Sequence, residues 1–176
     1  MAPQVELNLF IVKSKFFVLA LTAICFLTSF LPSAKDSINE GNYFPSFTVL
    51  ENQLAENNLS LNTDELILLN FWSLDDAASR IRSNSLKKMV EDFDNIVFVN
   101  ICTSSDLTLQ DEILKIDFGM ESNEKILNLA AMDVPADLLK PFEIESGNRL
   151  FILKSDGKVL SVMPSDSEIK SYCKIA

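Results

Sequence analysis

The sequence predicts a mixed α/β domain that follows an apolar N-terminal segment. Two apolar runs of strand length, residues 65–72 and 96–102, flank a helical pattern, and a β-hairpin with a final helix closes the chain. A strand, helix and strand in this order force a right-handed parallel crossover. The length of 176 residues is that of one domain.

Residues 1–35 are predicted to form a unit separate from the domain of residues 36–176. Lys13 and Lys15 precede residues 16–31, an apolar run without charge, which is typical of an export signal or a membrane anchor. Both interpretations stay open, because the run is slightly long for a signal and slightly short for a span of ~20 residues.

The basic flank of this run favours leaving the N-terminal tail inside and the domain outside. We therefore expect a place in the bacterial cell envelope, either periplasmic after cleavage or anchored to the inner membrane through residues 16–31. Cys25 is interpreted as an apolar residue of this run, with a lipoprotein as the alternative.

Composition excludes several functions. The chain has 25 acidic and 15 basic residues, and a net charge of -10 argues against binding nucleic acid. Hydrophobic residues at 48% and charged residues at 23% exclude a disordered chain and a polytopic membrane protein. The absence of histidine excludes the Ser-His-Asp triad, the Cys-His dyad and most catalytic zinc sites. We expect no metal and no cofactor.

The first half of the domain is predicted to alternate strands and helix. Residues 41–50 indicate an extended entry with a short edge strand, and residues 51–63 indicate turns around a weak strand. The apolar runs at 65–72 and 96–102 indicate strands buried on both faces. Between them, one helix face is formed by Leu86, Met89, Val90 and Phe93.

The second half is predicted to add helices and a hairpin. Asp166 places a negative charge at the positive end of the last helix. A helix is predicted at residues 106–118, followed by an ambiguous stretch at 119–131 and a short helix at 135–142 that is disturbed by Pro141. A strand at 149–154, a turn at 155–157 and an antiparallel strand at 158–163 form the hairpin, and the final helix is predicted at 165–174.

This order, together with particular residues, resembles the TlpA/ResA branch of thioredoxin-like thiol-disulfide oxidoreductases over about residues 41–174. Gly41, Pro45 and Phe47 are similar to the opening of that branch. The apolar strand that ends in Phe71-Trp72 and the segment Leu150-Phe151-Ile152-Leu153-Lys154-Ser155-Asp156-Gly157-Lys158 carry the rest. The resemblance implies a three-layer α/β/α sandwich with a central mixed sheet.

The redox site of this family is absent. On this alignment the two cysteines of CxxC fall at Asp76 and Ser79, and the cis-proline falls at Asn148. Thiol exchange needs a thiolate to attack and a second thiol to resolve the mixed disulfide, and a carboxylate and a hydroxyl do neither. The turn Asp76-Ala77-Ala78-Ser79-Arg80 is also similar to that of a bacterial envelope subgroup of the family.

Asp76 is interpreted as the N-cap of the helix that follows, with Ser79 in its first turn, exposed or helping the cap. An acid pair of Asp75 and Asp76, for a metal or for acid–base catalysis, is the alternative. Trp72 is interpreted as packing rather than as a contact, and Arg80 as a solvated residue or as one that covers an acidic partner.

Cys102 and Cys173 are interpreted as two inert apolar thiols, with a disulfide between them as the alternative. Neither opens a helix, so a redox role is less favoured.

Three functions follow. The first is a redox-inactive module that binds an envelope protein or peptide by backbone hydrogen bonds in the family's groove. The second is a thiol-disulfide oxidoreductase in cell redox homeostasis, and the third is an anchored structural accessory subunit. The residues expected to line the groove are Trp72, Ser73, Leu74, Asp75, Asp76, Ala77, Gly147, Asn148 and Arg149.

Overall fold

Five strands form one mixed sheet, seen in a computed structural model that describes residues 38–104, 124–143 and 149–173. The strand order is β3-β2-β1-β4-β5. Strands β1, β2 and β3 are parallel, whereas β4 is antiparallel to β1 and β5 is antiparallel to β4. Their bounds are Leu66–Trp72, Ile96–Cys102, Ile126–Ala130, Arg149–Lys154 and Val159–Val162 for β1 to β5.

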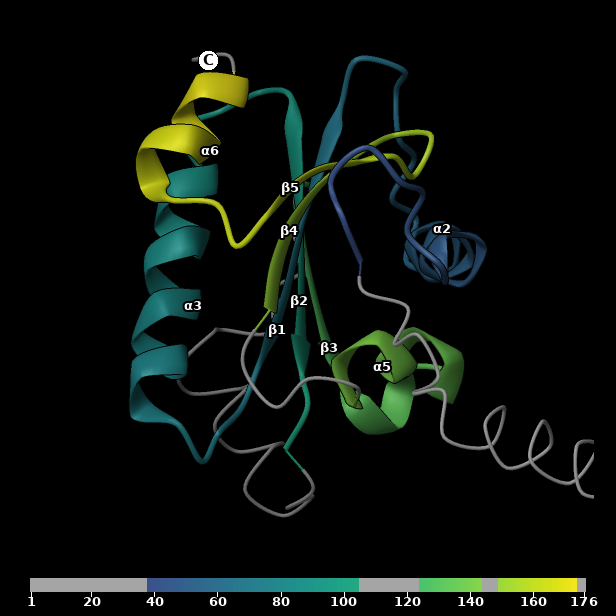
Figure 1. Cartoon of the computed structure of the whole chain (residues 1–176), viewed down its shortest axis with the longest axis vertical. Helices are drawn as coiled ribbons and strands as arrows, with labels where there is room; N and C mark the ends of the chain where they lie inside the picture. Colours follow the sequence, from purple (N-terminus) through teal and green to yellow (C-terminus); the bar gives the residue numbers. More distant parts are fainter. Residues whose placement is uncertain (1–37, 105–123, 144–148, 174–176) are drawn as a thin grey trace, which may run out of the picture. The chain divides into compact units, whose positions relative to one another are not determined.

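Helices cover both faces of the sheet, so the predicted three-layer α/β/α arrangement is confirmed (Figure 1). Helices α3 and α6 lie on one face, and α2 and α5 lie on the other. The bounds are Phe47–Glu56 for α2, Ala77–Val90 for α3, Ala136–Glu143 for α5 and Asp166–Tyr172 for α6, with a short 3-10 turn at Ala131–Asp133.

The strands that the sequence predicts at 65–72, 96–102, 149–154 and 158–163 are confirmed as β1, β2, β4 and β5. Every residue of β2 is buried, and in β1 only Leu66 is half-buried. A strand that is covered on both faces carries a continuous apolar run, which is why these strands can be predicted from the sequence.

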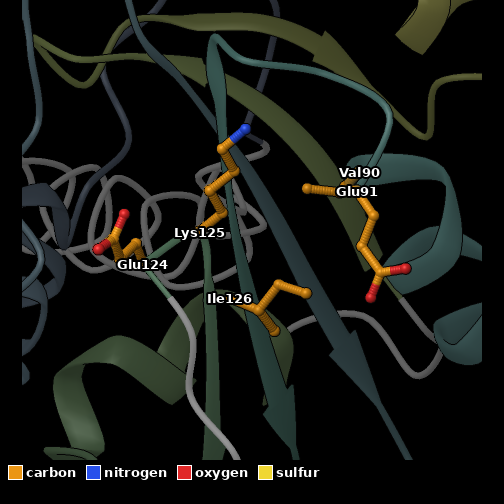
Figure 2. A pocket seen from close by; sticks show the side chains of 5 residues that line it. All are labelled: Val90, Glu91, Glu124, Lys125 and Ile126. Atoms are coloured by element: carbon orange, nitrogen blue, oxygen red, sulfur yellow. The ribbon is translucent and has the colours of Figure 1, made fainter. Parts of the chain in front are cut away.

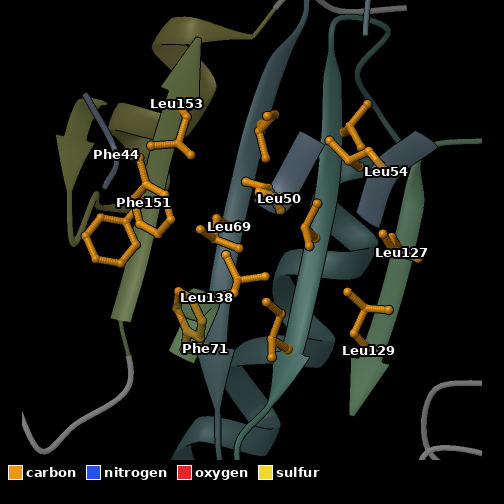
Figure 3. Packing of buried hydrophobic residues seen from close by; sticks show 14 of the residues in the cluster. Phe44, Leu50, Leu54, Leu69, Phe71, Leu127, Leu129, Leu138, Phe151 and Leu153 are labelled. Atoms are coloured by element: carbon orange, nitrogen blue, oxygen red, sulfur yellow. The ribbon is translucent and has the colours of Figure 1, made fainter. Parts of the chain in front are cut away.

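Two apolar layers hold the sandwich together. On the α2 and α5 face, Phe151 meets Phe44 and Phe71 edge to face, with ring centroids 5.7 and 6.3 Å apart. Leu50 and Leu54 of α2 pack onto the same layer (Figure 3). A fully buried leucine or phenylalanine stabilises the fold by about 1.5–3 kcal/mol, so this layer outweighs any single polar contact. The opposite layer contains Leu68, Leu86, Val90, Phe93, Ile96, Phe98, Ile126, Leu150, Ile152 and Ile169.

Helix α2 corrects the sequence prediction for residues 41–63. The expected short strand is reduced to one isolated bridge, Tyr43 to Lys158, and the expected weak strand is the helix. Leu50, Gln53 and Leu54 are its buried residues, at helical spacing. Burial of this face outweighs the strand preference of the Phe-Thr-Val segment.

Strand β3 resolves the stretch 119–131, which the sequence left ambiguous, whereas the helix predicted at 106–118 lies outside the described residues. The short helix predicted at 135–142 is confirmed as α5. Pro141 has no N–H for the carbonyl of Asp137, and the hydroxyl of Ser46 donates to that carbonyl instead, at 2.5 Å.

The final helix α6 is confirmed, and its N-cap is Ser165, whose hydroxyl accepts from the N–H of Glu168. Arg82 of α3 forms a salt bridge with Asp166 in the first turn of α6. The predicted N-terminal unit, residues 1–35, lies outside the described residues. Among the described helices, none is long and apolar enough to cross a membrane.

Candidate functional site

The turn between β1 and α3 lies at the carboxyl edge of the sheet, where the resemblance places the redox site. The carbonyl of Trp72, the last residue of β1, accepts from the N–H and the hydroxyl of Thr103, at 2.8 and 3.0 Å. Within the turn, the hydroxyl of Ser73 accepts from the N–H of Asp75 at 3.2 Å. The turn is therefore fixed to the neighbouring strand and to itself.

Asp76 is the N-cap of α3, as predicted. Its backbone is extended, with φ -113° and ψ 106°, and its carboxylate accepts from the N–H of Ala78 at 3.0 Å. This bond satisfies one of the N–H groups that a helix leaves unpaired in its first turn. The first turn holds no other acidic residue, so Asp76 is the negative charge that meets the positive end of the helix.

Ser79 is buried at 4% exposure, and its hydroxyl accepts from the N–H of Ser73 at 3.1 Å. The alternative of an exposed hydroxyl is therefore wrong. The hydroxyl therefore links the first turn of α3 to the start of the β1–α3 turn, six residues earlier in the chain. The two positions that match the family's cysteines thus differ in environment, because Asp76 is exposed and Ser79 is covered.

The other expected groove residues of this turn divide into two groups. Trp72 is fully buried and packs with Cys102 and Ala130, while half-buried Leu74 packs against that cluster. Trp72 therefore has the packing role that the sequence favours.

The second group of expected groove residues in this turn is exposed. It consists of Asp75, Asp76 and Ala77. Asp75 and Asp76 have different hydrogen-bond partners: Asp76 caps the helix, and Asp75 Oδ2 accepts from the hydroxyl of Ser104 at 3.4 Å. Within the described ranges, no three His, Cys, Asp or Glu residues are placed to hold a metal ion.

The second wall of the expected groove is described only at its end. Gly147 and Asn148 lie outside the described residues, and Arg149 begins β4 opposite Phe71 of β1. The backbone of Arg149 therefore lies at the same edge of the sheet as the turn.

A ladder of three asparagines crosses the sheet on the α3 side, two residues before the carboxyl end of each of three strands. Asn70, Asn100 and Asn128 are register partners on β1, β2 and β3. The amide of Asn70 donates to Asn100 Oδ1 at 2.8 Å, and the amide of Asn100 donates to Asn128 Oδ1 at 3.0 Å. Buried Ser83 of α3 also donates to Asn100 Oδ1, at 2.8 Å, which ties the helix to the sheet.

This ladder was not predicted, although the sequence contains a signal for it. Each asparagine interrupts an apolar strand two residues before the strand ends, and two of these strands are predicted from the sequence alone. An uncharged amide in each of two adjacent buried runs needs a partner, and its neighbour supplies one.

Within the described residues, Cys102 and Cys173 form no disulfide, so the alternative of a disulfide between them is not realised. Cys102 ends β2, whereas Cys173 follows Tyr172, whose carbonyl accepts from the amide of Asn95, just before β2 begins. They thus lie near opposite ends of a strand that spans about 20 Å, far beyond the Cα separation of about 7 Å that a disulfide allows.

The two thiols differ in burial. Cys102 is fully buried, and Cys173 is half-buried. Burial raises the pKa of Cys173 from 9.0 to about 11, which lowers the fraction of thiolate, the form that attacks a disulfide.

A cavity of about 290 Å³ lies at the other end of the strands (Figure 2). It is lined by Val90, Glu91, Glu124, Lys125 and Ile126. Lys125 Nζ is 3.0 Å from Asp94 Oδ1 and donates to the carbonyl of Phe93 at 2.9 Å, so it ties β3 to the loop before β2. This cavity belongs to the packing of that end and is separate from the turn.

Comparison with solved structures shows a thioredoxin-like fold. A thioredoxin-like protein from Parabacteroides distasonis superposes with a TM-score of 0.52 at 22% identity, over 63% of this chain and 82% of that chain. The C-terminal domain of a proposed thiol-disulfide oxidoreductase from Bacteroides thetaiotaomicron superposes with a TM-score of 0.53 at 20% identity, over 78% and 94%. No family model matches the sequence. No curated protein matches it either.

Proposed function

We propose that this thioredoxin-like chain is a redox-inactive domain of the bacterial cell envelope that binds an extended segment of an envelope protein at the turn Ser73–Ala77. The observation that carries the proposal is that the side chains of Asp76 and Ser79 both accept hydrogen bonds from backbone N–H groups of the turn and the helix start. These residues stand where the family has its thiols, and each is engaged in holding the turn.

The chemistry of the turn supports binding rather than electron transfer. An oxidoreductase of this fold must form a mixed disulfide on an exposed thiolate and resolve it with a second thiol. The turn offers a carboxylate and a hydroxyl, which accept hydrogen bonds and form no disulfide. The fully buried Cys102 and the protonated Cys173 do not replace them.

The turn nevertheless keeps the features that a binding surface needs. It is fixed by Thr103 and Ser79, so little conformational entropy is lost when a partner binds. Its outer residues Asp75, Asp76 and Ala77 are exposed. An extended segment laid along such an edge gains main-chain hydrogen bonds in the manner of strand addition.

A thiol-disulfide oxidoreductase is the second candidate. Its support is the name of the Bacteroides thetaiotaomicron structure, which shares the fold. It requires a source of thiols other than the turn, and it separates from the first candidate by an assay of disulfide reduction.

The binding proposal is tested by placing a photo-reactive amino acid at Ala77 in the full chain and irradiating cells. Ala55 of α2, which is also exposed but lies on the opposite side of the sheet, is the matched control. We expect a discrete cross-linked product from position 77 and none from position 55. In the same background, Ala78→Arg should remove the product by crowding the turn, and Ala55→Arg should not.

Equal cross-linking from both positions, or a product that survives Ala78→Arg, would contradict binding at the turn. An accessory subunit that binds its partner through another surface would give no product from position 77.

A further inference from the structure

The segment between α2 and β1 contains the acceptor pattern for an N-linked sugar. Asn58, Leu59 and Ser60 form the tripeptide Asn-x-Ser, in which the middle residue is any residue except proline. No other asparagine of the sequence is followed two residues later by serine or threonine. Because so short a pattern also arises by chance, its surroundings in the structure decide whether a sugar can be attached there.

The structure exposes both polar side chains of this tripeptide. Asn58 and Ser60 are exposed, whereas Leu59 is 8% exposed and belongs to the apolar layer on the α2 side of the sheet. Within the described residues, the side chain of Asn58 makes no hydrogen bond. Its amide nitrogen is therefore accessible to a transferring enzyme.

The backbone holds Asn58 in a fixed, outward position at the end of α2. The N–H of Asn58 donates to the carbonyl of Ala55 at 3.1 Å, and the N–H of Leu59 donates to that of Leu54 at 2.9 Å. With φ 59° at Asn58, these two bonds form a Schellman motif. Glycine most often occupies this position of the motif, and Ser60 lies beyond it. The end of the helix therefore does not account for the pairing of this asparagine with Ser60.

A hollow of about 480 Å³ lies beside the two exposed side chains, and both of them line it. Its wall also contains the apolar side chains of Leu54 and Leu61 and the polar side chains of Glu51 and Ser155. A pyranose ring has an apolar C–H face and a rim of hydroxyl groups. A mixed wall of this kind suits such a ring, because the leucines can pack on the face and the polar groups can bind the hydroxyls.

We propose that Asn58 carries an N-linked glycan, transferred in the cell envelope from a sugar that is joined through a diphosphate to a lipid. Transfer forms a bond between Asn58 Nδ2 and C1 of the sugar, and it breaks the bond from C1 to the diphosphate, which leaves with the electron pair. The amide loses one of its two protons to a base of the transferring enzyme. The first sugar then lies in the hollow.

This proposal rests on the export of the domain, which is part of the proposed function, and not on binding at the turn Ser73–Ala77. Residues 57–65 lead into the amino end of β1, whereas that turn follows its carboxyl end. The seven residues of β1 separate the two places by about 23 Å. A glycan on Asn58 therefore leaves the turn free for a partner.

The test uses the full chain purified from the envelope fraction of the cells that produce it, with mass spectrometry of the peptide that contains residues 57–63. We expect the wild-type peptide to exceed its sequence mass by whole sugar residues, attached to Asn58. Ser60→Ala should return the peptide to its sequence mass, because it removes the hydroxyl that the pattern requires, and Ser60→Thr should keep the added mass. Asn62→Gln changes an exposed asparagine outside the pattern and should also keep it.

Circular dichroism checks that Ser60→Ala keeps the fold. A wild-type peptide of sequence mass, from a chain found in the envelope fraction, would overturn the glycan and leave binding at the turn untouched. Added mass that persists in Ser60→Ala, or that Asn62→Gln removes, would overturn it as well. An unmodified chain found in the cytoplasm would overturn the glycan together with the envelope location.

Discussion

Replacing the N-cap of α3 tests how the turn is held. In Asp76→Ala, the N–H of Ala78 loses the carboxylate that lies 3.0 Å away, and the first turn of α3 loses its negative charge. Loss of an aspartate N-cap costs about 1 kcal/mol, and the carboxylate is exposed, so water replaces part of the bond. We expect the free energy of unfolding to fall by about 1 kcal/mol, with partner cross-linking from position 77 largely kept.

Two further variants separate the bond from the charge. Asp76→Asn keeps an oxygen acceptor and should lose only the dipole contribution, about 0.3–1 kcal/mol. Asp64→Ala removes an exposed carboxylate from the loop before β1 and should cost nothing measurable. Urea unfolding followed by circular dichroism measures all three.

If Asp76→Ala were as stable as Asp64→Ala, the cap would contribute nothing. If it abolished an activity while the domain stayed folded, Asp76 would be a functional group rather than a cap.

Three other perturbations test other parts of the structure. Gly157→Ala should lower the free energy of unfolding by about 2 kcal/mol or more, because Gly157 has φ +86° and a Cβ there would lie 2.3 Å from the ring of Phe47; thermal unfolding measures it. Met163→Gly should raise the unfolding free energy by up to about 1 kcal/mol, because Met163 holds φ 54° and is 58% exposed, so strain is relieved and little packing is lost; a fall in the urea midpoint would refute this. Alkylation of Cys173 at pH 8 should be about 100-fold slower in the folded chain than in urea, since a pKa of about 11 instead of 9.0 reduces the thiolate by that factor, and equal rates would contradict the burial. Because this pKa is raised in the folded state, the thiol's contribution to stability is present below about pH 9 and is lost as the pH rises toward 11.

The sequence predicts the parts of this fold whose signals are local. Strands β1 and β2 are covered on both faces and therefore appear as apolar runs. The cap of α3 is also local, because an aspartate at the start of a helix reaches an N–H two residues away. These features depend on near neighbours in the chain and need no knowledge of the tertiary structure.

The parts that the sequence does not predict depend on distant contacts. The sequence predicts a short edge strand within residues 41–50 and turns around a weak strand in residues 51–63, whereas a helix is selected there by burial of Leu50 and Leu54 against the sheet. Strand β3 is obscured by Asn128, whose amide is tolerated because Asn100 of the neighbouring strand pairs with it.

The site shows the same division. That Asp76 caps the helix follows from its position, but the burial of Ser79 requires the position of the turn above it. The absence of the family's thiols is visible in the sequence, whereas the opposite placement of Cys102 and Cys173 requires the strand order and the path of α6.

The most direct test of the account is insulin disulfide reduction by the chain, with Cys102→Ser and Cys173→Ser as controls and with Asp76→Cys combined with Ser79→Cys as a comparison. We expect no turnover by the wild-type chain above the reductant alone. We also expect the double cysteine variant to stay below full reductase activity, because Asn148 stands where the family has proline. Turnover by the wild-type chain that disappears in either serine variant would contradict the account and would place the active site at that thiol.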